Sequence, residues 1–384
     1  MTTHSVSEWM PLLVPDMPSP QSLLPWLERM HASKHYSNFG PLVRMLEAEF
    51  AQRFSLSIDQ VTTVANATQG LELALQALDL SPGARVLLPT FTFVASATAV
   101  LQAGFVPVLA DVDPHSWMLT PEIARRACAD THIDVVLTVA ALGMPHDMRA
   151  WAQFELDTGL PVVVDAAAAY GSQWLPQGVL GTLIFSLHTT KSLPAGEGGL
   201  VISNRPGFIS RVRQLSNFGI NLDLAAEIPV GALANIGTNA KMSEYHAAIA
   251  LEMLKSWDVF ALQRRVLLTE LQEELSRVSD GGVNWQCEGA GGALMSPTLL
   301  CVRLPSGVMR EKLQLICEDL KISTRRWYQP LLHKMDALMS RSILLDTPVA
   351  DELADTLIGL PFFREMSFPQ KQLLRDAMKF TFKG

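Results

Sequence analysis

Two stretches, LPVVVDAAAAYG at residues 160–171 and LIFSLHTTKSLPAGEGGLV at residues 183–201, decide the fold. Each begins with a short apolar run and continues into small or polar residues, which is typical of a buried strand that ends at a loop. The strand candidates along the chain are TTVA (62–65), RVLLP (85–89), VPVLAD (106–111), DVVLTV (134–139), PVVVD (161–165), LIFSLH (183–188) and GLVISN (199–204). Because helix-length segments separate the early runs, the sequence predicts an α/β fold. We expect a mostly parallel sheet of seven strands that is covered on both faces.

Two features complete the organisation of the predicted sheet and its connection to the rest of the chain. Only a short Gly-rich loop joins the runs at 183–188 and 199–204, which favours an antiparallel hairpin at one side of the sheet. Residues 241–278 then form one long or kinked helix with a sustained apolar face.

The length of the chain, 384 residues, predicts a large domain and a smaller one. We place the large domain at residues 1–245, including an N-terminal segment at 1–35. The linking helix and a small C-terminal α/β domain then occupy residues 246–384, with a strand near 298–304 and a helix near 308–320.

Composition excludes several classes of protein. The net charge is -8 and no basic run is present, which argues against a nucleic-acid partner. No window reaches the roughly 18 apolar residues of a membrane span, so we expect no membrane partner. The first twenty residues have neither the basic start nor the apolar core of a signal peptide, which favours a cytoplasmic protein. The four cysteines, Cys128, Cys287, Cys301 and Cys317, show no CxxC spacing and are expected to be free thiols, with no metal site.

The segment VANATQGLELAL (64–75) reads as a strand, a turn of small residues and then a helix. The free N–H groups and the dipole of a helix N-terminus attract an anion such as a phosphate. Thr68 and Gln69 would present backbone amides there, and the Thr68 hydroxyl would add a donor. Alternatively, Thr68 is an ordinary helix N-cap.

Two residues carry the chemistry that this turn suggests. Asp165 closes a buried apolar run, where an unpaired carboxylate is costly, and the N–H of a protonated pyridine ring would satisfy it. Lys191 follows the next strand, and a lysine can form a Schiff base with a carbonyl group. Ser186 could reach the same phosphate, and the glycines of AGEGG (195–199) permit close backbone approach. Together these residues predict pyridoxal 5'-phosphate as the cofactor.

Phe93, in the segment PTFTFVAS after a predicted strand, could lie against the face of that ring. A buried core aromatic is the alternative.

With these residues placed, the chain resembles the DegT/DnrJ/EryC1/StrS family of nucleotide-sugar aminotransferases, which have the fold-type-I pyridoxal-phosphate architecture. The resemblance covers nearly the whole chain. The motifs that carry it are NFGPLVRMLEAEF (38–50), LSPGARVLLPTFTFVASATAVLQAGFVPVLADVDP (80–114), GMPHDM (143–148), DAAAAYG (165–171), FSLHTTKSLPAGEGG (185–199), NFG (217–219), GTNAKMSEYHAAI (237–249) and STRRWYQPLLH (323–333).

The resemblance implies a role for each cofactor-binding residue. Lys191 is the Schiff-base lysine and proton shuttle, and Asp165 pairs with the pyridine nitrogen. The remaining contacts come from Thr68, Gln69 and Ser186 at the phosphate and from Phe93 on the ring.

It also implies a homodimer with a shared active site, in which Asn239 reaches the phosphate of the neighbouring subunit. Lys241 is then a candidate for the sugar or phosphates of the substrate, or else a surface lysine. The segment at 323–333 would grip the substrate, because arginine suits diphosphate oxygens and an aromatic can lie against a base or sugar. Its candidates are Arg325, Arg326, Trp327, Tyr328 and His333; a strand with two exposed arginines is the alternative.

The activity that the resemblance implies is transfer of an amino group from glutamate to a nucleotide-linked keto-sugar, in the synthesis of antibiotic or surface-polysaccharide sugars. The alternatives are another fold-type-I enzyme, such as an amino-acid aminotransferase or a sugar dehydratase, and a binding protein that has lost catalysis. Dehydratases of the family carry histidine where Lys191 stands, so transamination is favoured. One departure concerns Ala168, because the family commonly has Gln or His at that position, near the phenolic oxygen of the cofactor. The departure puts the substrate in doubt.

Overall fold

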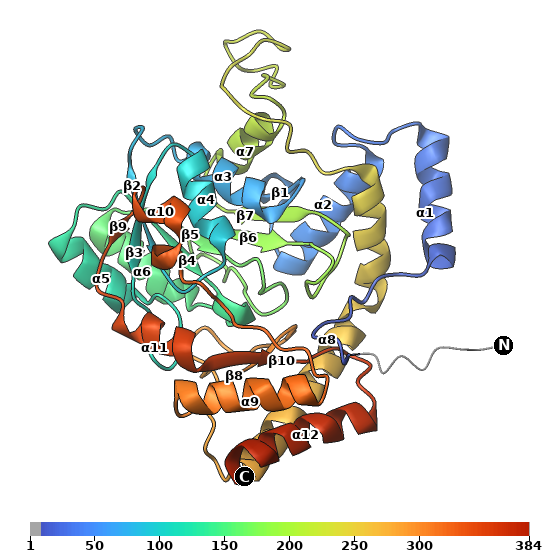
Figure 1. Cartoon of the computed structure of the whole chain (residues 1–384). Coiled ribbons are helices and arrows are strands. Elements are labelled where there is room, and N and C mark those ends of the chain that lie inside the picture. The colour runs from blue at the N-terminus through green and yellow to red at the C-terminus, as the bar shows by residue number, and fades with distance from the viewer. Residues whose placement is uncertain (1–8, 384) are drawn as a thin grey trace.

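A sheet of eight strands lies at the centre of the computed structural model, which describes residues 9–383 (Figure 1). The order of its strands is β1-β7-β6-β5-β4-β2-β3-β9. Their bounds are β1 Val61–Val64, β2 Arg85–Pro89, β3 Val106–Ala110, β4 Val135–Val139, β5 Val162–Asp165, β6 Thr182–Ser186, β7 Gly199–Ser203 and β9 Ile343–Leu344. Neighbouring strands are parallel from β6 to β9, whereas β7 is antiparallel to both β6 and β1. The predicted α/β class and the predicted hairpin are therefore confirmed.

The predicted number of seven strands is wrong by one, because β9 was missed. This strand has only two residues, and they pair with Val108 and Leu109 of β3. A two-residue strand shows no periodicity, and this one follows the linking helix in the chain, far from the other strands of the sheet.

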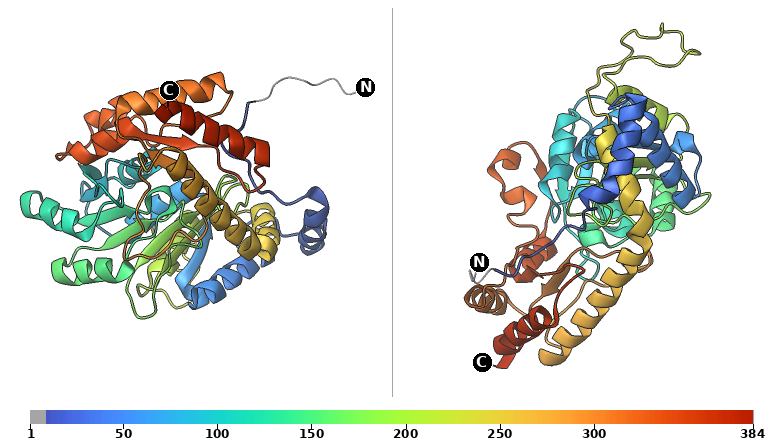
Figure 2. Two further views of the ribbon diagram at one scale, coloured as in Figure 1. Left: turned by 90° about the horizontal axis from the view of Figure 1, so that it is seen from below. Right: turned by 90° about the vertical axis from the view of Figure 1, so that its right-hand side faces the viewer.

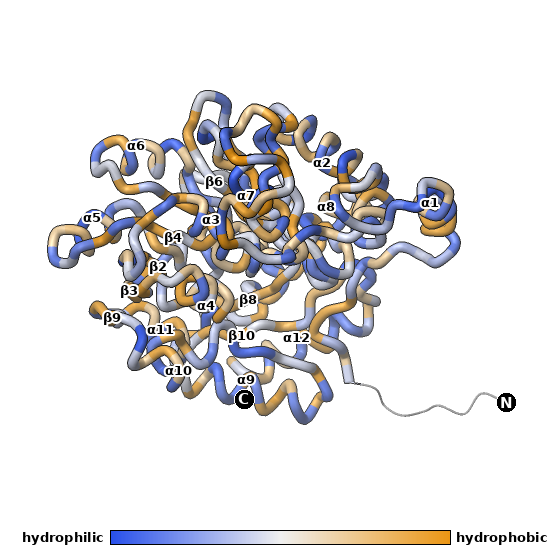
Figure 3. Tube along the Cα trace, turned by 90° about the horizontal axis from the view of Figure 1, so that it is seen from above, coloured by the Kyte–Doolittle hydropathy of each residue, from blue (hydrophilic) through white to orange (hydrophobic). Residues whose placement is uncertain are grey.

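Helices cover both faces of the sheet. One face carries α3 (Ala67–Ala77), α4 (Val94–Gln102) and α7 (Phe208–Ser216). The other carries α2 (Pro41–Phe54), α5 (Pro121–Asp130), α6 (Met148–Thr158) and the first part of α8 (Glu244–Val278). Figure 3 shows polar and apolar segments alternating along the outer helices α5 and α6, as expected for helices with one buried face.

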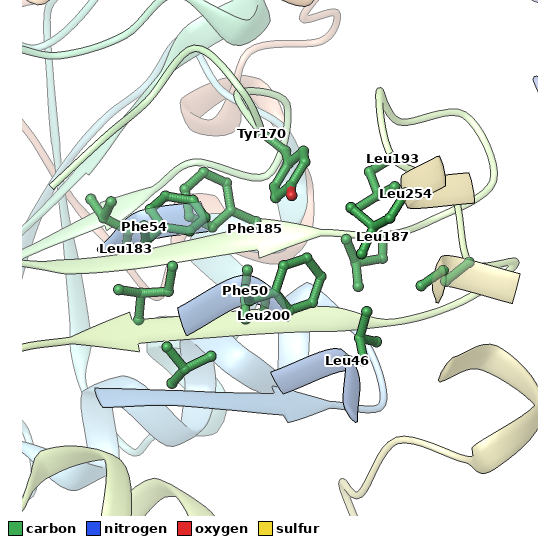
Figure 4. Packing of buried hydrophobic residues seen from close by; sticks show 14 of the residues in the cluster. Leu46, Phe50, Phe54, Tyr170, Leu183, Phe185, Leu187, Leu193, Leu200 and Leu254 are labelled. Atoms are coloured by element: carbon green, nitrogen blue, oxygen red, sulfur yellow. The ribbon is translucent and has the colours of Figure 1, made fainter. Parts of the chain in front are cut away.

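Successive residues of β6 pack on opposite faces of the sheet, because side chains alternate along a strand. Ile184 packs with the α3 side, whereas Leu183 and Phe185 pack with the α2 and α8 side. Figure 4 shows the cluster on the α2 and α8 side of the sheet, in which Phe50 and Phe54 of α2 lie against the hairpin of β6 and β7. The hairpin that leads to Lys191 is therefore held rigidly between two helical layers.

Helix α8 connects the sheet to the C-terminal part of the chain (Figure 2). Its first half, including Ala247 and Leu254, belongs to the core beside the sheet, and its second half, including Leu267 and Leu275, belongs to a separate core. That second core packs around a two-stranded antiparallel sheet, which we call the small domain. The strands of this sheet are β8 Leu300–Arg303 and β10 Leu357–Leu360, and the helices of the small domain are α9 Gly307–Asp319, α11 Pro348–Thr356 and α12 Phe368–Lys383.

Two peripheral features complete the chain. Helix α1 (Pro20–Ser33) packs against α8, and the short α10 (Asp336–Met339) precedes β9. The segment 217–240, which we call the arm, projects from the body between α7 and α8 (Figures 1 and 2). Within residues 9–383, no helix has both the length and the apolar character needed to cross a membrane.

Candidate active site

A cavity of about 760 Å³ lies at the carboxyl ends of the parallel strands, where the sheet meets the small domain. Ligands in open α/β sheets bind at this edge. Its lining comes from the start of α3, the start of α4, the end of β5, the loop after β6 and the small domain. The lining residues that were predicted from the sequence are Thr68, Gln69, Phe93, Asp165, Ser186, Lys191, Arg325, Trp327 and Tyr328.

Asp165 is the last residue of β5 and is only 5% exposed. Both of its carboxylate oxygens accept hydrogen bonds, Oδ2 from the Ser96 hydroxyl at 2.7 Å and Oδ1 from the Ala167 N–H at 3.1 Å. Burial raises the pKa of this carboxyl, and the two hydrogen bonds and the charge of Lys191 oppose the rise. A cationic group in the cavity would therefore stabilise the charged carboxylate further.

Lys191 lies in the loop between β6 and β7 and lines the same cavity. Its backbone N–H donates to the carbonyl of His188 at 2.9 Å, which closes a turn in front of the lysine. Burial lowers the pKa of the Lys191 amine, and the nearby charge of Asp165 partly opposes the change. A lowered pKa increases the fraction of neutral amine, which is the form that can act as a nucleophile or a base.

The start of α3 forms the anion-binding end of the cavity. Its N-cap is Asn66, whose side-chain oxygen accepts the N–H of Gln69 at 2.9 Å. The alternative that Thr68 is the N-cap is therefore wrong, because the N-cap lies two residues earlier, at Asn66, and Thr68 is already within the helix. The Gln69 N–H is already bonded, which corrects the expectation that it is free for a phosphate. In the part of the chain that the structure describes, the N–H of Thr68 has no backbone or side-chain partner, and the Thr68 and Gln69 side chains line the cavity.

Two more residues shape this end. Ser186, the last residue of β6, lines the cavity, and its hydroxyl accepts the N–H of His188 at 3.2 Å. Gly199 begins β7 directly beneath the turn, where a Cβ would lie 2.8 Å from the backbone of Asn66. The close backbone approach expected from AGEGG is thus present at this glycine.

These residues fit pyridoxal phosphate on chemical grounds. The cavity has a buried carboxylate at one end, a helix N-terminus with a free N–H and hydroxyls at the other, and an amine with a lowered pKa on its wall. The three features match a protonated ring nitrogen, a phosphate and an aldehyde, respectively. Phe93 caps α4 and also lines the cavity, with an exposed fraction of 54% that leaves its ring free to contact a bound molecule.

The small domain contributes three of its five predicted substrate residues to the cavity. Arg325 is exposed, and its guanidinium lies 4.4 Å from the centre of the Trp327 ring. Tyr328 accepts the N–H of Leu142 at 3.4 Å, which leaves its own O–H free to donate. Burial raises the pKa of the Tyr328 phenol, so the group stays neutral.

Arg326 and His333 lie outside the cavity lining. Arg326 donates to the carbonyl of Ala354 in α11, and His333 bonds the Thr90 hydroxyl at 2.8 Å. The first of the two neighbouring arginines therefore faces the site and the second faces the small domain. This separation does not support a substrate role for Arg326 or His333.

Asn239 and Lys241 lie at the base of the arm and are not among the residues that line the cavity of their own chain. Lys241 donates to the Asn239 side chain at 2.7 Å, and its ammonium lies 4.4 Å from the Phe218 ring centre. Asn239 is exposed and does not line the cavity of its own chain.

Several residues of the site escaped the sequence reasoning. Ala168 lines the cavity, but several polar lining residues were missed: Asn66, Thr92, His188, Thr190, Glu197 and Thr298. Ser96, which bonds Asp165 from outside the lining, was missed as well. Leu13 of the N-terminal segment also lines the cavity. The capping signal of Asn66 before α3 was readable from the sequence, whereas Ser96 and Leu13 reach the site only through tertiary contacts.

Known proteins are similar to this chain in sequence and in fold. A sequence model described as the DegT/DnrJ/EryC1/StrS aminotransferase family matches residues 22–378. Protein Rv3402c of Mycobacterium tuberculosis is 27% identical over 376 residues, covering 93% of this chain and 86% of that protein. A Bacillus cereus chain assigned to the PLP-dependent aminotransferases is 26% identical with a TM-score of 0.86, covering 97% of this chain and 100% of that one. The enzyme DesI, solved in the presence of its TDP-sugar product, is 28% identical with a TM-score of 0.84, covering 98% of this chain and 94% of that one.

Proposed function

This chain belongs to the DegT/DnrJ/EryC1/StrS aminotransferase family, and we propose that it transfers an amino group from glutamate to a keto-sugar linked to a nucleoside diphosphate. Pyridoxal 5'-phosphate is its cofactor. The reaction takes place in the cytoplasm and serves the synthesis of an amino sugar.

The observation that carries the proposal is the joint placement of Lys191 and Asp165 in one cavity with the N-terminus of α3. Each feature alone has an ordinary structural explanation. Together they provide an amine, a buried acid and an anion site within one space of about 760 Å³, which is enough for a cofactor and part of a substrate.

Different residues of this chain have different roles in the proposed reaction. Bound pyridoxal phosphate supplies the electron sink that accepts the electron pair released when a C–H bond next to nitrogen breaks. The Lys191 amine, with its lowered pKa, takes the proton from the α-carbon of the amino donor. Asp165, held by Ser96 and the Ala167 N–H, would supply the negative charge that keeps the ring nitrogen of the cofactor protonated. The start of α3 and Ser186 would hold its phosphate.

A nucleotide-linked sugar as acceptor is supported by the likeness to DesI, which was solved with its TDP-sugar product. The mouth of the cavity also suits such a substrate. Arg325 has a planar guanidinium that can bind diphosphate oxygens through two N–H groups, and Trp327 offers an aromatic surface. Tyr328 can donate a hydrogen bond to a sugar oxygen.

We further propose a homodimer in which Asn239 and Lys241 of one chain serve the active site of the other. The projecting arm supports this arrangement, because its apolar side chains Leu224 and Ile236 are 92% and 83% exposed. Exposed apolar side chains gathered on one segment favour burial against a partner.

The decisive experiment is turnover of a panel of nucleotide-linked keto-sugars with glutamate by the purified holoenzyme, followed by mass spectrometry. The expected result is a product in which one oxygen has been replaced by an amino group, with 2-oxoglutarate formed in equal amount. If no member of the panel reacts while 2-oxo acids do, the enzyme is an amino-acid aminotransferase and the proposed acceptor is wrong.

A further inference from the structure

A buried ion-pair network lies directly behind the lysine loop. Arg264 of α8 is 5% exposed, and its guanidinium donates to the backbone carbonyl of Ser192 at 2.9 Å. Ser192 is the residue that follows Lys191. A second N–H of the same guanidinium donates to Asp16 Oδ2 at 2.5 Å.

Asp16 belongs to residues 10–19, an extended segment that we call the N-terminal strap. Its side chain is 11% exposed, and its second oxygen accepts the Nε–H of Arg364 in the small domain at 3.1 Å. Arg364 in turn lies 4.0 Å from the ring centre of Phe260 in α8. The single carboxylate of Asp16 therefore joins two arginines from different parts of the chain.

The strap is also held before Asp16 by backbone hydrogen bonds to the small domain. Met10 exchanges backbone hydrogen bonds with Lys321 and Ser323, and Leu12 accepts the N–H of Phe362 at 2.9 Å. Leu13, three residues before Asp16, lines the same cavity as Lys191. The strap thus runs from the edge of the small domain past the active site to Arg264.

The backbone around Lys191 is held from both sides. In front of the lysine, its own N–H bonds the His188 carbonyl at 2.9 Å. Behind it, the Ser192 hydroxyl donates to the carbonyl of Tyr170 at 2.8 Å, and Tyr170 packs on Trp257 of α8 at a ring distance of 5.2 Å. Arg264 holds the remaining polar group of Ser192, its carbonyl. Two of these three hydrogen bonds, those made by Ser192, therefore depend on α8 or on a residue packed against it.

We propose that Arg264 is a positioning residue for Lys191 and that Asp16 of the N-terminal strap completes it, so that the strap is part of the active-site machinery. The guanidinium fixes the carbonyl that follows the lysine, and Asp16 fixes the guanidinium. An arginine is needed because its planar guanidinium presents separate N–H donors toward Ser192 and toward Asp16 at the same time. The donors of a lysine all lie on a single nitrogen, which cannot span the two acceptors in the same way. The inference rests on the proposed role of Lys191.

A small displacement of Lys191 would be costly, because the amine must reach a reacting carbon with defined geometry. We therefore expect Arg264→Met holoenzyme to show a donor half-reaction about 10- to 100-fold slower than the wild type. The pH midpoint of the visible absorbance of the bound cofactor should also move, by about one unit, because that absorbance reports the environment of the lysine nitrogen. Asp16→Asn and Arg264→Lys should each give a smaller change in the same direction.

The matched control is Arg265→Met, because Arg265 is the next residue of α8 and, among residues 9–383, its side chain hydrogen-bonds the Met295 sulfur, at 3.1 Å, and no part of the lysine loop. It should have the rate and the pH midpoint of the wild type. Thermal unfolding of all four variants separates folding from positioning. If Arg264→Met does not fold, the half-reaction rates and pH midpoints of Asp16→Asn and Arg264→Lys test the proposal instead.

A loss of thermal stability in these variants, with unchanged half-reaction rate and unchanged pH midpoint, would mean that the network only stabilises the fold and would overturn the proposal. Failure of the proposed function looks different. In that case the wild-type chain itself, mixed with pyridoxal phosphate and reduced with borohydride, carries no cofactor on the peptide that contains Lys191.

Discussion

The hydroxyl of Ser96 donates a 2.7 Å hydrogen bond to Oδ2 of Asp165, and both side chains are buried. The Ser96 oxygen also lies 3.1 Å from the Thr92 hydroxyl, so a short chain of hydroxyls ends on the carboxylate. Burial alone raises the pKa of Asp165, and the hydrogen bond from Ser96 is the largest influence that opposes it. The charge of Asp165 therefore depends on a residue of α4 that does not line the cavity.

Ser96→Ala should weaken cofactor binding by about tenfold, because a hydrogen bond to a charged group contributes roughly 1.5–3 kcal/mol and part of that loss falls on the ion pair with the ring. Titration of the cofactor-free chain with pyridoxal phosphate, followed by absorbance, measures the change. Thr98→Ala is the matched control on the same helix, since the Thr98 hydroxyl bonds only the carbonyl of Ala95. Equal affinity of the Ser96 and Thr98 variants for pyridoxal phosphate would show that Ser96 does not contribute to cofactor binding.

Lys191→Ala should abolish turnover while leaving the fold intact, because the amine is the only group assigned to proton transfer. The variant should also lose the covalent attachment of the cofactor. Borohydride reduction followed by peptide mass spectrometry checks this directly, with Lys241→Ala as a control that keeps the label. A Lys191→Ala enzyme that turned over at the wild-type rate would contradict the central assignment.

Arg325→Gln should raise the KM for the acceptor by about 10- to 100-fold and leave the glutamate half-reaction nearly unchanged, because a lost charged hydrogen bond costs roughly 1.5–3 kcal/mol. Arg326→Gln is the natural comparison, since that neighbouring arginine bonds the carbonyl of Ala354 and not the cavity. It should lower stability without changing the acceptor KM. If Arg326→Gln raised the acceptor KM and Arg325→Gln did not, the assignment of Arg325 to the substrate would be wrong.

These two arginines show what the sequence could and could not reveal. Asp165 and Lys191 were predicted because one ends and the other follows a local apolar run, and parallel strands bring such residues to one edge. The choice between Arg325 and Arg326 depends on which face of an irregular segment meets the sheet, and that is set by tertiary packing. Ser96 contacts Asp165 across 69 positions, and Arg264 contacts Asp16 across 248, so no local pattern could indicate either contact.

Acid should destabilise the protein through His146, which is buried below the end of β4. Its ring bonds the carbonyl of Val139 at 2.9 Å, and burial lowers its pKa from 6.5 to about 4. Between these two values the unfolded chain binds a proton that the folded chain does not, so the free energy of unfolding falls as pH decreases from about 6.5 to about 4. The loss attributable to His146 is at most about 3 kcal/mol.

Urea unfolding at several pH values measures this dependence. His146→Gln should lower stability at pH 7, because the packing and hydrogen bonds of the ring are lost, yet the difference from the wild type should shrink as pH falls toward 4. His132→Gln provides the control, because the His132 side chain is 72% exposed. A difference between wild type and His146→Gln that stays constant over this range would show that His146 does not carry the effect.

The shared active site can be tested by combining two defective chains in one dimer. A hybrid of Lys191→Ala and Asn239→Ala subunits contains one site with the wild-type lysine and, from the other subunit, the wild-type asparagine. If Asn239 serves the partner's cofactor, such a hybrid should recover about half of the wild-type activity, because one of two symmetric sites is complete. Two different affinity tags allow the hybrid to be purified and assayed at limiting cofactor concentration.

The control hybrid pairs Lys191→Ala with Asp165→Asn. Both residues line the cavity of the same chain, so neither site of this hybrid is complete and no activity should return. The Asn239→Ala homodimer must itself be strongly impaired for the comparison to be informative. Given that impairment, recovery in the first hybrid and none in the second can arise only if Asn239 acts across the interface while Asp165 acts within its own chain. An Asn239→Ala homodimer with wild-type activity, equal activity in the two hybrids, or a chain that sediments as an active monomer would instead confine Asn239 to the arm, where its contact with Lys241 at 2.7 Å is then a purely local one.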